Sequence, residues 1–175
     1  DRPMDLLPWM LALLAWATLL LLIAVLQGKL LFGRTWRIRR TDPGPDAARR
    51  RAEPLQLERP GGVRLEGWLS RHAEQAPRRL LLWLGGRNEH VAWTPDLGGW
   101  LPPDVALAAF NYRSLGGSGG WPSEAACVAD AAAITDTLLE RLQLPLGALH
   151  LAGRSLGSGV ALQLAVRRTP ASLLL

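Results

Sequence analysis

The chain has 175 residues and a formal net charge of +5, carried almost entirely by arginine because Lys29 is the only lysine. This length is enough for one domain and an anchor, and the scattered arginines lack the interleaved aromatic residues of a nucleic-acid surface. The single cysteine, Cys127, excludes a disulfide framework and a cysteine-based metal site. We therefore predict no nucleic-acid partner, no metal and no cofactor.

The first predicted element is a membrane-spanning helix. The run from Leu6 to Leu26 has no charged residue, and its length suits the ~30 Å of hydrocarbon in a bilayer. A cleavable signal peptide is the alternative, but it favours a basic start, a shorter apolar run and a small-x-small cleavage site. Here Asp1 and Asp5 lie at the start, and the run is long. We expect residues 1–28 to form an N-terminal transmembrane anchor in the lipid bilayer.

Basic residues after this span set its expected orientation. Only Arg2 precedes it, whereas those that follow are Lys29, Arg34, Arg37, Arg39 and Arg40. The positive-inside rule then places the remaining chain in the cytoplasm, on a single-pass membrane protein. We expect residues 29–54 to be a basic juxtamembrane linker. Its Arg49-Arg50-Arg51 is more typical of a solvated linker than of a contact with anionic lipid headgroups.

Residues 55–175 are predicted to form a domain in which strands and helices alternate. The runs Leu55–Glu58 and Val63–Leu69 alternate apolar and polar residues on either side of Pro60-Gly61-Gly62, which predicts a β-hairpin. Two continuous apolar runs, Arg79–Leu84 and Asp104–Asn111, predict buried strands. The amphipathic run Ser123–Gln143 predicts a helix that buries Cys127, and Leu146–Ala152 is the strand predicted after it. The order predicts an α/β fold, a mixed sheet flanked by helices.

A G-x-S-x-G sequence, Gly153-Arg154-Ser155-Leu156-Gly157, lies between the last predicted strand and a helical run, Ser158–Val166. A strand, a tight turn and a helix in this order are typical of a nucleophile elbow. Gly153 and Gly157 are expected because a Cβ at either position would collide with the neighbouring strand or helix. We predict Ser155 as a catalytic nucleophile; an ordinary helix-capping serine is the alternative.

The same pattern occurs in Gly116-Gly117-Ser118-Gly119-Gly120, within the loop 111–124. Ser118 lies well beyond its strand, so we predict a flexible surface loop. As a phosphate cradle this loop lacks the G-K-[ST] of a P-loop. We predict a structural loop in which Ser123 caps the next helix and Arg113 can pair with Glu124.

The glycine-rich segment Gly85-Gly86-Arg87 follows a predicted buried strand. In an acyl-transfer enzyme of this kind, the second oxyanion N–H comes from such a loop. We predict the backbone N–H groups of Arg87 and Leu156 as the oxyanion hole. Asn88, Glu89 and His90 are given no catalytic role, and His90 is expected at a loop or helix start.

Two groups of residues together carry a family resemblance. The first is Tyr112-Arg113, then Gly116, Gly117, Ser118 and Gly120, then Pro122-Ser123-Glu124; the second is Gly153-Arg154-Ser155-Leu156-Gly157. They resemble the Y-R-G-x-G-x-S-x-G-x-P-S-E and G-x-S-L-G motifs of membrane-anchored serine hydrolases in the α/β-hydrolase superfamily, related to serine aminopeptidase-like and prolyl-oligopeptidase-like enzymes. Lys29-Leu30-Leu31-Phe32 after the anchor is also similar to that group. The resemblance covers nearly the whole chain and implies a serine hydrolase.

The sequence departs from that pattern at three places. Ser114 stands where the family usually has glycine, and Gly85-Gly86 replaces a His-Gly pair. The family's catalytic acid and histidine follow the serine, yet no Asp, Glu or His follows Ser155. His150, on the strand before the elbow, is expected to be a core or edge residue, and His72 to lie in a polar turn.

These observations predict the N-terminal part of an α/β-hydrolase, with residues 169–175 leaving a helix and opening a sixth strand. The intact enzyme would cleave an ester, thioester or amide of unknown acyl group through an acyl-enzyme on Ser155. The sequence as given, without triad acid and histidine, is expected to be inactive. The alternative is a catalytically inactive, membrane-tethered binding or scaffold module with the same fold.

Overall fold

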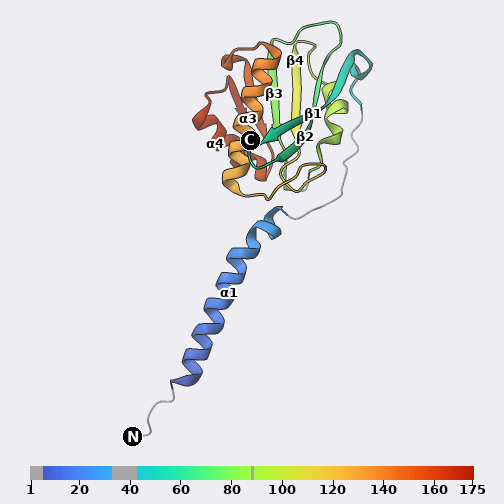
Figure 1. Cartoon of the computed structure of the whole chain (residues 1–175). Helices are drawn as coiled ribbons and strands as arrows, with labels where there is room; N and C mark the ends of the chain where they lie inside the picture. Colours follow the sequence, from blue (N-terminus) through green and yellow to red (C-terminus); the bar gives the residue numbers. More distant parts are fainter. Residues whose placement is uncertain (1–5, 33–42, 88) are drawn as a thin grey trace.

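The computed structural model describes residues 6–32, 43–87 and 89–175 (Figure 1). Its helices are α1 (Leu7–Phe32), α2 (Thr94–Gly98), α3 (Glu124–Leu142) and α4 (Leu156–Arg167), with 3-10 turns η1 (Ala47–Arg49), η2 (Val91–Trp93) and η3 (Leu146–Ala148). Its strands are β1 (Arg50–Arg59), β2 (Val63–His72), β3 (Arg79–Leu84), β4 (Val105–Phe110), β5 (Leu149–Gly153) and β6 (Ser172–Leu174).

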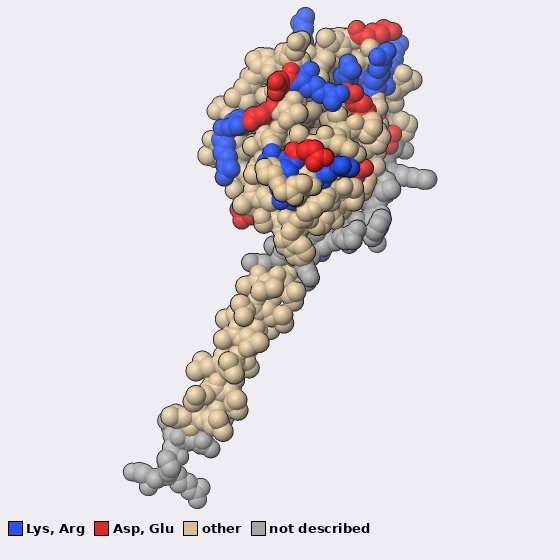
Figure 2. All heavy atoms as spheres, viewed as in Figure 1, with Lys and Arg blue, Asp and Glu red and all other residues tan. Residues whose placement is uncertain are grey.

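Helix α1 is long and apolar enough to cross a membrane. Its stretch Leu7–Leu26 has a mean hydropathy of 2.5, and none of it is buried against the rest of the chain. No charged side chain interrupts this stretch (Figure 2). The basic residues used to predict its orientation, Arg34, Arg37, Arg39 and Arg40 and the side chain of Lys29, lie outside what the structure describes.

One six-stranded mixed sheet organises the rest of the described chain, in the order β1-β2-β4-β3-β5-β6. The hairpin β1–β2 is antiparallel, and β2 also runs antiparallel to β4. The strands β4, β3, β5 and β6 run parallel to one another. Because the carboxyl ends of parallel strands meet at one edge, the loops after β3, β4 and β5 are brought together there.

Helices cover both faces of the sheet. On one face Leu80, Leu82 and Leu84 of β3 join the core formed with α3 and α4, which pack against each other (Figure 1). Side chains alternate along a strand, so Trp83 points to the opposite face. There its ring meets the edge of Trp93 in η2, beside α2, with ring centres 5.4 Å apart. This arrangement confirms the predicted mixed sheet flanked by helices.

The predicted elements of the domain are present, but two strands have other bounds. The strand predicted from Leu146 begins only at Leu149, because Leu146–Ala148 is the turn η3. The first strand begins earlier than expected. It starts at Arg50 instead of Leu55, within the stretch predicted as a linker. The Arg50 guanidinium is half-buried and donates to the carbonyl oxygens of Ser70, Leu101 and Val105. Burial accordingly lowers its pKa. The prediction that Arg50 is a solvated linker residue was therefore wrong, since its side chain is part of the fold.

Candidate active site

Ser155 occupies the turn between β5 and α4 in a backbone conformation that residues other than glycine rarely adopt. Its φ is 54° and its ψ is −117°, and its side chain makes no capping hydrogen bond with the helix. The residue is exposed to solvent. A non-glycine residue with this φ is strained, and such strain persists only where the surrounding structure imposes it. The alternative of an ordinary capping serine is thus wrong.

The two glycines that flank Ser155, Gly153 and Gly157, lie where the neighbouring backbone leaves no room for a side chain. A Cβ built on Gly153 would lie 2.6 Å from the carbonyl oxygen of Gly157. A Cβ built on Gly157 would lie 1.8 Å from the carbonyl oxygen of Leu84, at the end of β3. Both distances are shorter than any real contact of a Cβ atom, so only glycine fits either position. The steric reason predicted for these glycines is confirmed.

The turn is also fixed by hydrogen bonds. The Arg154 N–H donates to the Leu84 carbonyl oxygen at 3.0 Å, and the Ser158 hydroxyl donates to the Gly153 carbonyl oxygen at 3.1 Å. Leu156 opens α4, and the next two N–H groups, of Gly157 and Ser158, donate to the carbonyl oxygens of Arg154 and Ser155 at 3.0 Å. The N-terminal end of a helix carries a partial positive charge. The turn thus presents a serine hydroxyl beside helix N–H groups.

The loop after β3 lies beside this turn because β3 and β5 are parallel neighbours, with Leu84 paired to Gly153. Arg87 is exposed in this loop. The loop closes around Glu89, whose N–H donates to the Gly86 carbonyl oxygen at 3.2 Å. The Glu89 carboxylate is buried and binds the Arg154 guanidinium at 2.7 Å. Sequence reasoning gave Glu89 no role and missed this link; Asn88 lies outside the described residues.

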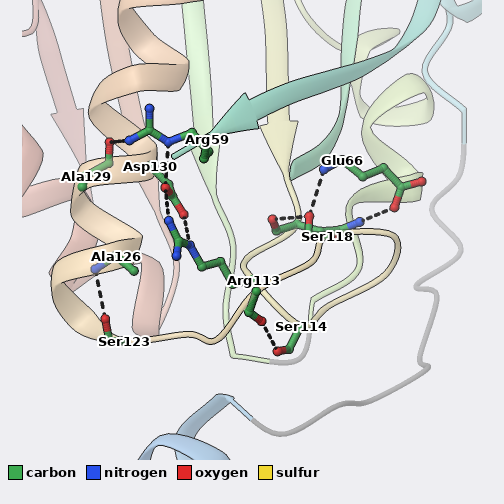
Figure 3. Close-up of polar contacts among 11 residues, drawn as sticks. Arg59, Glu66, Arg113, Ser114, Ser118, Ser123, Ala126, Ala129 and Asp130 are labelled. Atoms are coloured by element: carbon green, nitrogen blue, oxygen red, sulfur yellow. Dashed lines mark hydrogen bonds and ion pairs between the residues drawn. The ribbon is translucent and has the colours of Figure 1, made fainter. Parts of the chain in front are cut away.

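The second G-x-S-x-G match is part of the domain's packing. Ser118 is buried; its hydroxyl donates to the Asn111 carbonyl oxygen and accepts from the Glu66 N–H, both at 2.9 Å (Figure 3). The Glu66 carboxylate accepts from the Gly117 N–H at 2.6 Å and the Asn111 side-chain amide at 3.1 Å. The prediction of a flexible surface loop was therefore wrong. The Gly117 N–H, which a phosphate cradle would offer to its ligand, is instead bonded to the Glu66 carboxylate.

The rest of this loop agrees with a structural role but pairs differently from the prediction. Ser123 caps α3, as expected, by accepting from the Ala126 N–H at 3.2 Å. Arg113 does not pair with Glu124. It binds Asp130 in α3, with Nε 2.7 Å from Oδ2, and Arg59 binds the same carboxylate at 2.9 Å (Figure 3).

Ser114 stands where the motif that this loop resembles has a glycine, and the structure shows how a serine fits there. It has a φ of 63°, in the region that favours glycine, and its hydroxyl donates to the Gly120 carbonyl oxygen at 2.7 Å. This bond closes the loop locally and offsets part of the backbone strain. The loop therefore keeps a glycine-like conformation without the glycine.

No family model matches the chain. Two curated proteins of Mycobacterium tuberculosis, from strains CDC 1551 and H37Rv and both described as uncharacterised, are 32% identical to it over 120 residues. The match covers 68% of this chain and 43% of each relative. The chain thus spans less than half the length of the curated relatives it matches.

Solved structures show the architecture. An esterase of Pyrococcus furiosus is similar with a TM-score of 0.54, 18% identity and coverage of 73% of this chain and 52% of that chain. Acetyl xylan esterase 1 of a Thermoanaerobacterium species is similar with a TM-score of 0.58 and 13% identity, over 74% of this chain and 48% of that chain. An alpha-beta hydrolase of Vibrio vulnificus is similar with a TM-score of 0.55 and 21% identity, over 70% of this chain and 44% of that chain. The chain has the α/β-hydrolase fold. At these identities the likeness shows the fold alone.

In α/β-hydrolases the serine of a G-x-S-x-G turn works with an acid and a histidine that follow it in the chain. The three histidines of this sequence all precede Ser155, and none is bonded to it among the described residues. His72 and His90 accept backbone N–H groups in their own turns, and His90 starts η2 as expected. His150 Nδ1 lies 2.7 Å from the Ser172 hydroxyl, between β5 and β6.

Proposed function

We propose that the protein is a membrane-anchored serine hydrolase that cleaves an ester, thioester or amide through an acyl-enzyme on Ser155. The observation that carries this proposal is the backbone of Ser155, strained at φ 54° on the turn from β5 into α4 of an α/β-hydrolase fold. A strained strand-to-helix turn holds the serine oxygen clear of the backbone, where it can reach a carbonyl carbon.

The proposed reaction has two steps. The Ser155 Oγ attacks the substrate carbonyl and loses its proton to a general base; the bond to the leaving oxygen, sulfur or nitrogen breaks, and the leaving group takes that proton. Water then attacks the acyl-serine, and the acid product leaves with the serine hydroxyl restored. The backbone N–H groups of Leu156 and Arg87 are our candidates for stabilising the oxyanion in both steps.

The proposed triad needs a general base that residues 1–175 do not offer after Ser155. A serine hydroxyl without a base is a weak nucleophile near neutral pH. We therefore expect residues 1–175 alone to hydrolyse a short activated ester no faster than their Ser155→Ala version. The second candidate function is an inactive binding or scaffold module with this fold, which would need no general base.

Helix α1 supports the proposed location. We infer that Leu7–Leu26 spans the membrane and that the hydrolase domain lies on the cytoplasmic side, since the basic residues follow the span. Tethering would keep Ser155 near the membrane surface. The acyl substrate itself is left open by this proposal.

The deciding experiment is labelling of the full-length protein with a fluorophosphonate probe, followed by mapping of the modified residue. We expect labelling at Ser155 and none in the Ser155→Ala variant. Ser118→Ala is the matched control, because it removes a serine from the other G-x-S-x-G match. Ser118 bridges Glu66 and Asn111, so this control should lose stability, and its labelling is measured on the folded fraction.

The possible results separate the two candidate functions. Labelling that is lost in Ser155→Ala and kept in Ser118→Ala supports the hydrolase. Labelling that persists in Ser155→Ala, or a folded full-length protein that never reacts, would favour the binding module instead.

A further inference from the structure

The Glu89 carboxylate joins the two loops that the proposed oxyanion hole requires. Its side chain is 3% exposed. Oε2 accepts from the Gly86 N–H at 2.9 Å and from the Arg154 Nε at 2.8 Å. Oε1 accepts from the indole N–H of Trp83 at 3.0 Å. One buried carboxylate therefore contacts the end of β3, the loop after it, and the residue that precedes Ser155.

These contacts fix the backbone on both sides of the candidate oxyanion donor, the Arg87 N–H. Arg87 comes directly after Gly86, whose N–H is bound by the Glu89 side chain and whose carbonyl oxygen is bound by the Glu89 N–H. The short turn that contains the Arg87 peptide is thus closed on itself. On the other side, Arg154 is held both through its guanidinium and through its N–H, which donates to Leu84.

The glycines of the loop leave room for this pair and little else. A Cβ on Gly85 would lie 3.2 Å from the Glu89 carboxylate carbon, and a Cβ on Gly86 would lie 3.3 Å from Arg154 Nη2. Both distances are tighter than ordinary contacts. The loop backbone is therefore packed against the Glu89–Arg154 pair, so a displacement of the pair would move the backbone.

Stability gives a weak reason for a buried carboxylate here. Its partner Arg154 is 50% exposed, so solvent screens the attraction between the two charges, while burial of the carboxylate costs desolvation energy. Positioning gives a stronger reason, because an oxyanion hole needs its donors held at about 3 Å from the developing charge before the reaction begins.

We propose that Glu89 is a positioning residue of the active site. Through Gly86 and Arg154 it fixes the Arg87 N–H relative to Ser155 and Leu156, so that both donors meet the same oxyanion. The inference rests on the proposed function and concerns how that site is held together.

Glu89→Gln in the full-length protein tests this inference. The amide keeps the shape of the side chain, but its NH2 group must face either the Trp83 N–H or the Gly86 N–H and Arg154, so donors then oppose each other. With a fluorophosphonate probe we expect the maximal labelling rate at Ser155 to fall by roughly 10- to 100-fold, somewhat less than loss of an oxyanion donor outright. Probe affinity should change by less than about twofold, because the loss is confined to the transition state.

A second substitution separates positioning from mere folding. Trp83→Phe in the Glu89→Gln background removes the indole N–H that would oppose the amide, so the amide can keep its oxygen toward Gly86 and Arg154. We expect this double variant to recover most of the lost labelling rate. Asp136→Asn is the matched control, since it makes the same change of charge in an ion pair with an arginine, Arg168, which directly follows α4. Its labelling rate should equal that of the wild type.

Each outcome bears on the inference alone. A wild-type labelling rate in Glu89→Gln would overturn it, as would a loss that follows only the unfolded fraction and is not recovered by Trp83→Phe. Failure of the proposed function would look different, because the folded wild type would then never react, or its labelling would persist in Ser155→Ala whatever residue stood at position 89.

Discussion

The α-carbon of Gly157 faces the carbonyl oxygen of Leu84 so closely that a methyl group on it would lie 1.8 Å from that oxygen. This contact joins the first turn of α4 to the end of β3, and with it the Ser155 turn to the Gly85–Glu89 loop. The three atoms nearest to such a methyl group, from Leu84 and Gly85, all belong to the backbone, which cannot rotate aside.

Gly157→Ala should therefore destabilise the full-length protein by about 3 kcal/mol, at the upper end of the range for overpacking, and it should lower labelling at Ser155. Gly159→Ala is the control on the same helix, since a Cβ there meets nothing within 4 Å. It should raise stability by up to ~1 kcal/mol through helix propensity. The two midpoints of urea unfolding provide the measurement, and similar midpoints would refute the close contact.

Asp130→Asn should destabilise the domain. It is 7% exposed and binds both Arg113 and Arg59, so Asp130→Asn would leave two guanidinium groups without their counter-charge. We expect a loss of roughly 3 kcal/mol, because removal of one partner from a buried pair leaves an uncompensated charge. Thermal unfolding measures it, with Asp136→Asn, whose carboxylate is 54% exposed, as a control that should shift little.

Cys127 should make stability fall at alkaline pH. Burial, and to a smaller extent the Asp130 carboxylate, raises the pKa of its thiol from 9.0 to about 12. Because the folded pKa lies above the unfolded one, the stabilisation is complete below about pH 9 and is lost as pH rises toward 12. Between about pH 9 and pH 11, the wild type should lose unfolding free energy more steeply than Cys127→Ala. Parallel curves would contradict the shift.

The anchor prediction separates a membrane span from a signal sequence. An N-terminal epitope tag on the full-length protein should remain on the mature chain and stay with the membranes through a high-salt wash. A signal sequence would instead be removed together with the tag. A reporter fused after Leu175 should be active on the cytoplasmic side only, and activity on the outer side would reverse the proposed orientation.

Local chemistry made part of this site predictable. Ser123 was found as a cap because capping depends on the residues directly beside it, and the glycines around Ser155 were found because a sharp turn leaves room for no other residue. The strand order was harder. The pairing of β2 with β4, and of β3 with both β4 and β5, joins segments far apart in the chain, and no local pattern specifies such neighbours.

Charged residues caused most of the errors. Arg50 resembled its neighbours in a basic run, although its guanidinium binds carbonyl oxygens within the fold. Arg113 was expected to reach Glu124, the acid next to it in the motif, but the next turns of α3 bring Asp130 to it instead. Glu89 was given no catalytic role, and its contact with Arg154 becomes visible only when β3 and β5 are placed side by side.

The place of Arg50 also determines how the domain would respond to mechanical load. It opens β1, the strand at the edge of the sheet, and pairs with His72 at the end of the ladder away from the hairpin turn. A pull transmitted from the N-terminal helix would first break the hydrogen bonds of the Gly44 and Asp46 N–H groups to the Asp96 and Gly99 carbonyl oxygens. It would then peel β1 from β2 one pair at a time, starting at Arg50. The Arg50 guanidinium is bonded to Ser70 in β2 and Val105 in β4, so the first pair of the ladder to carry the force is also tied to two other strands.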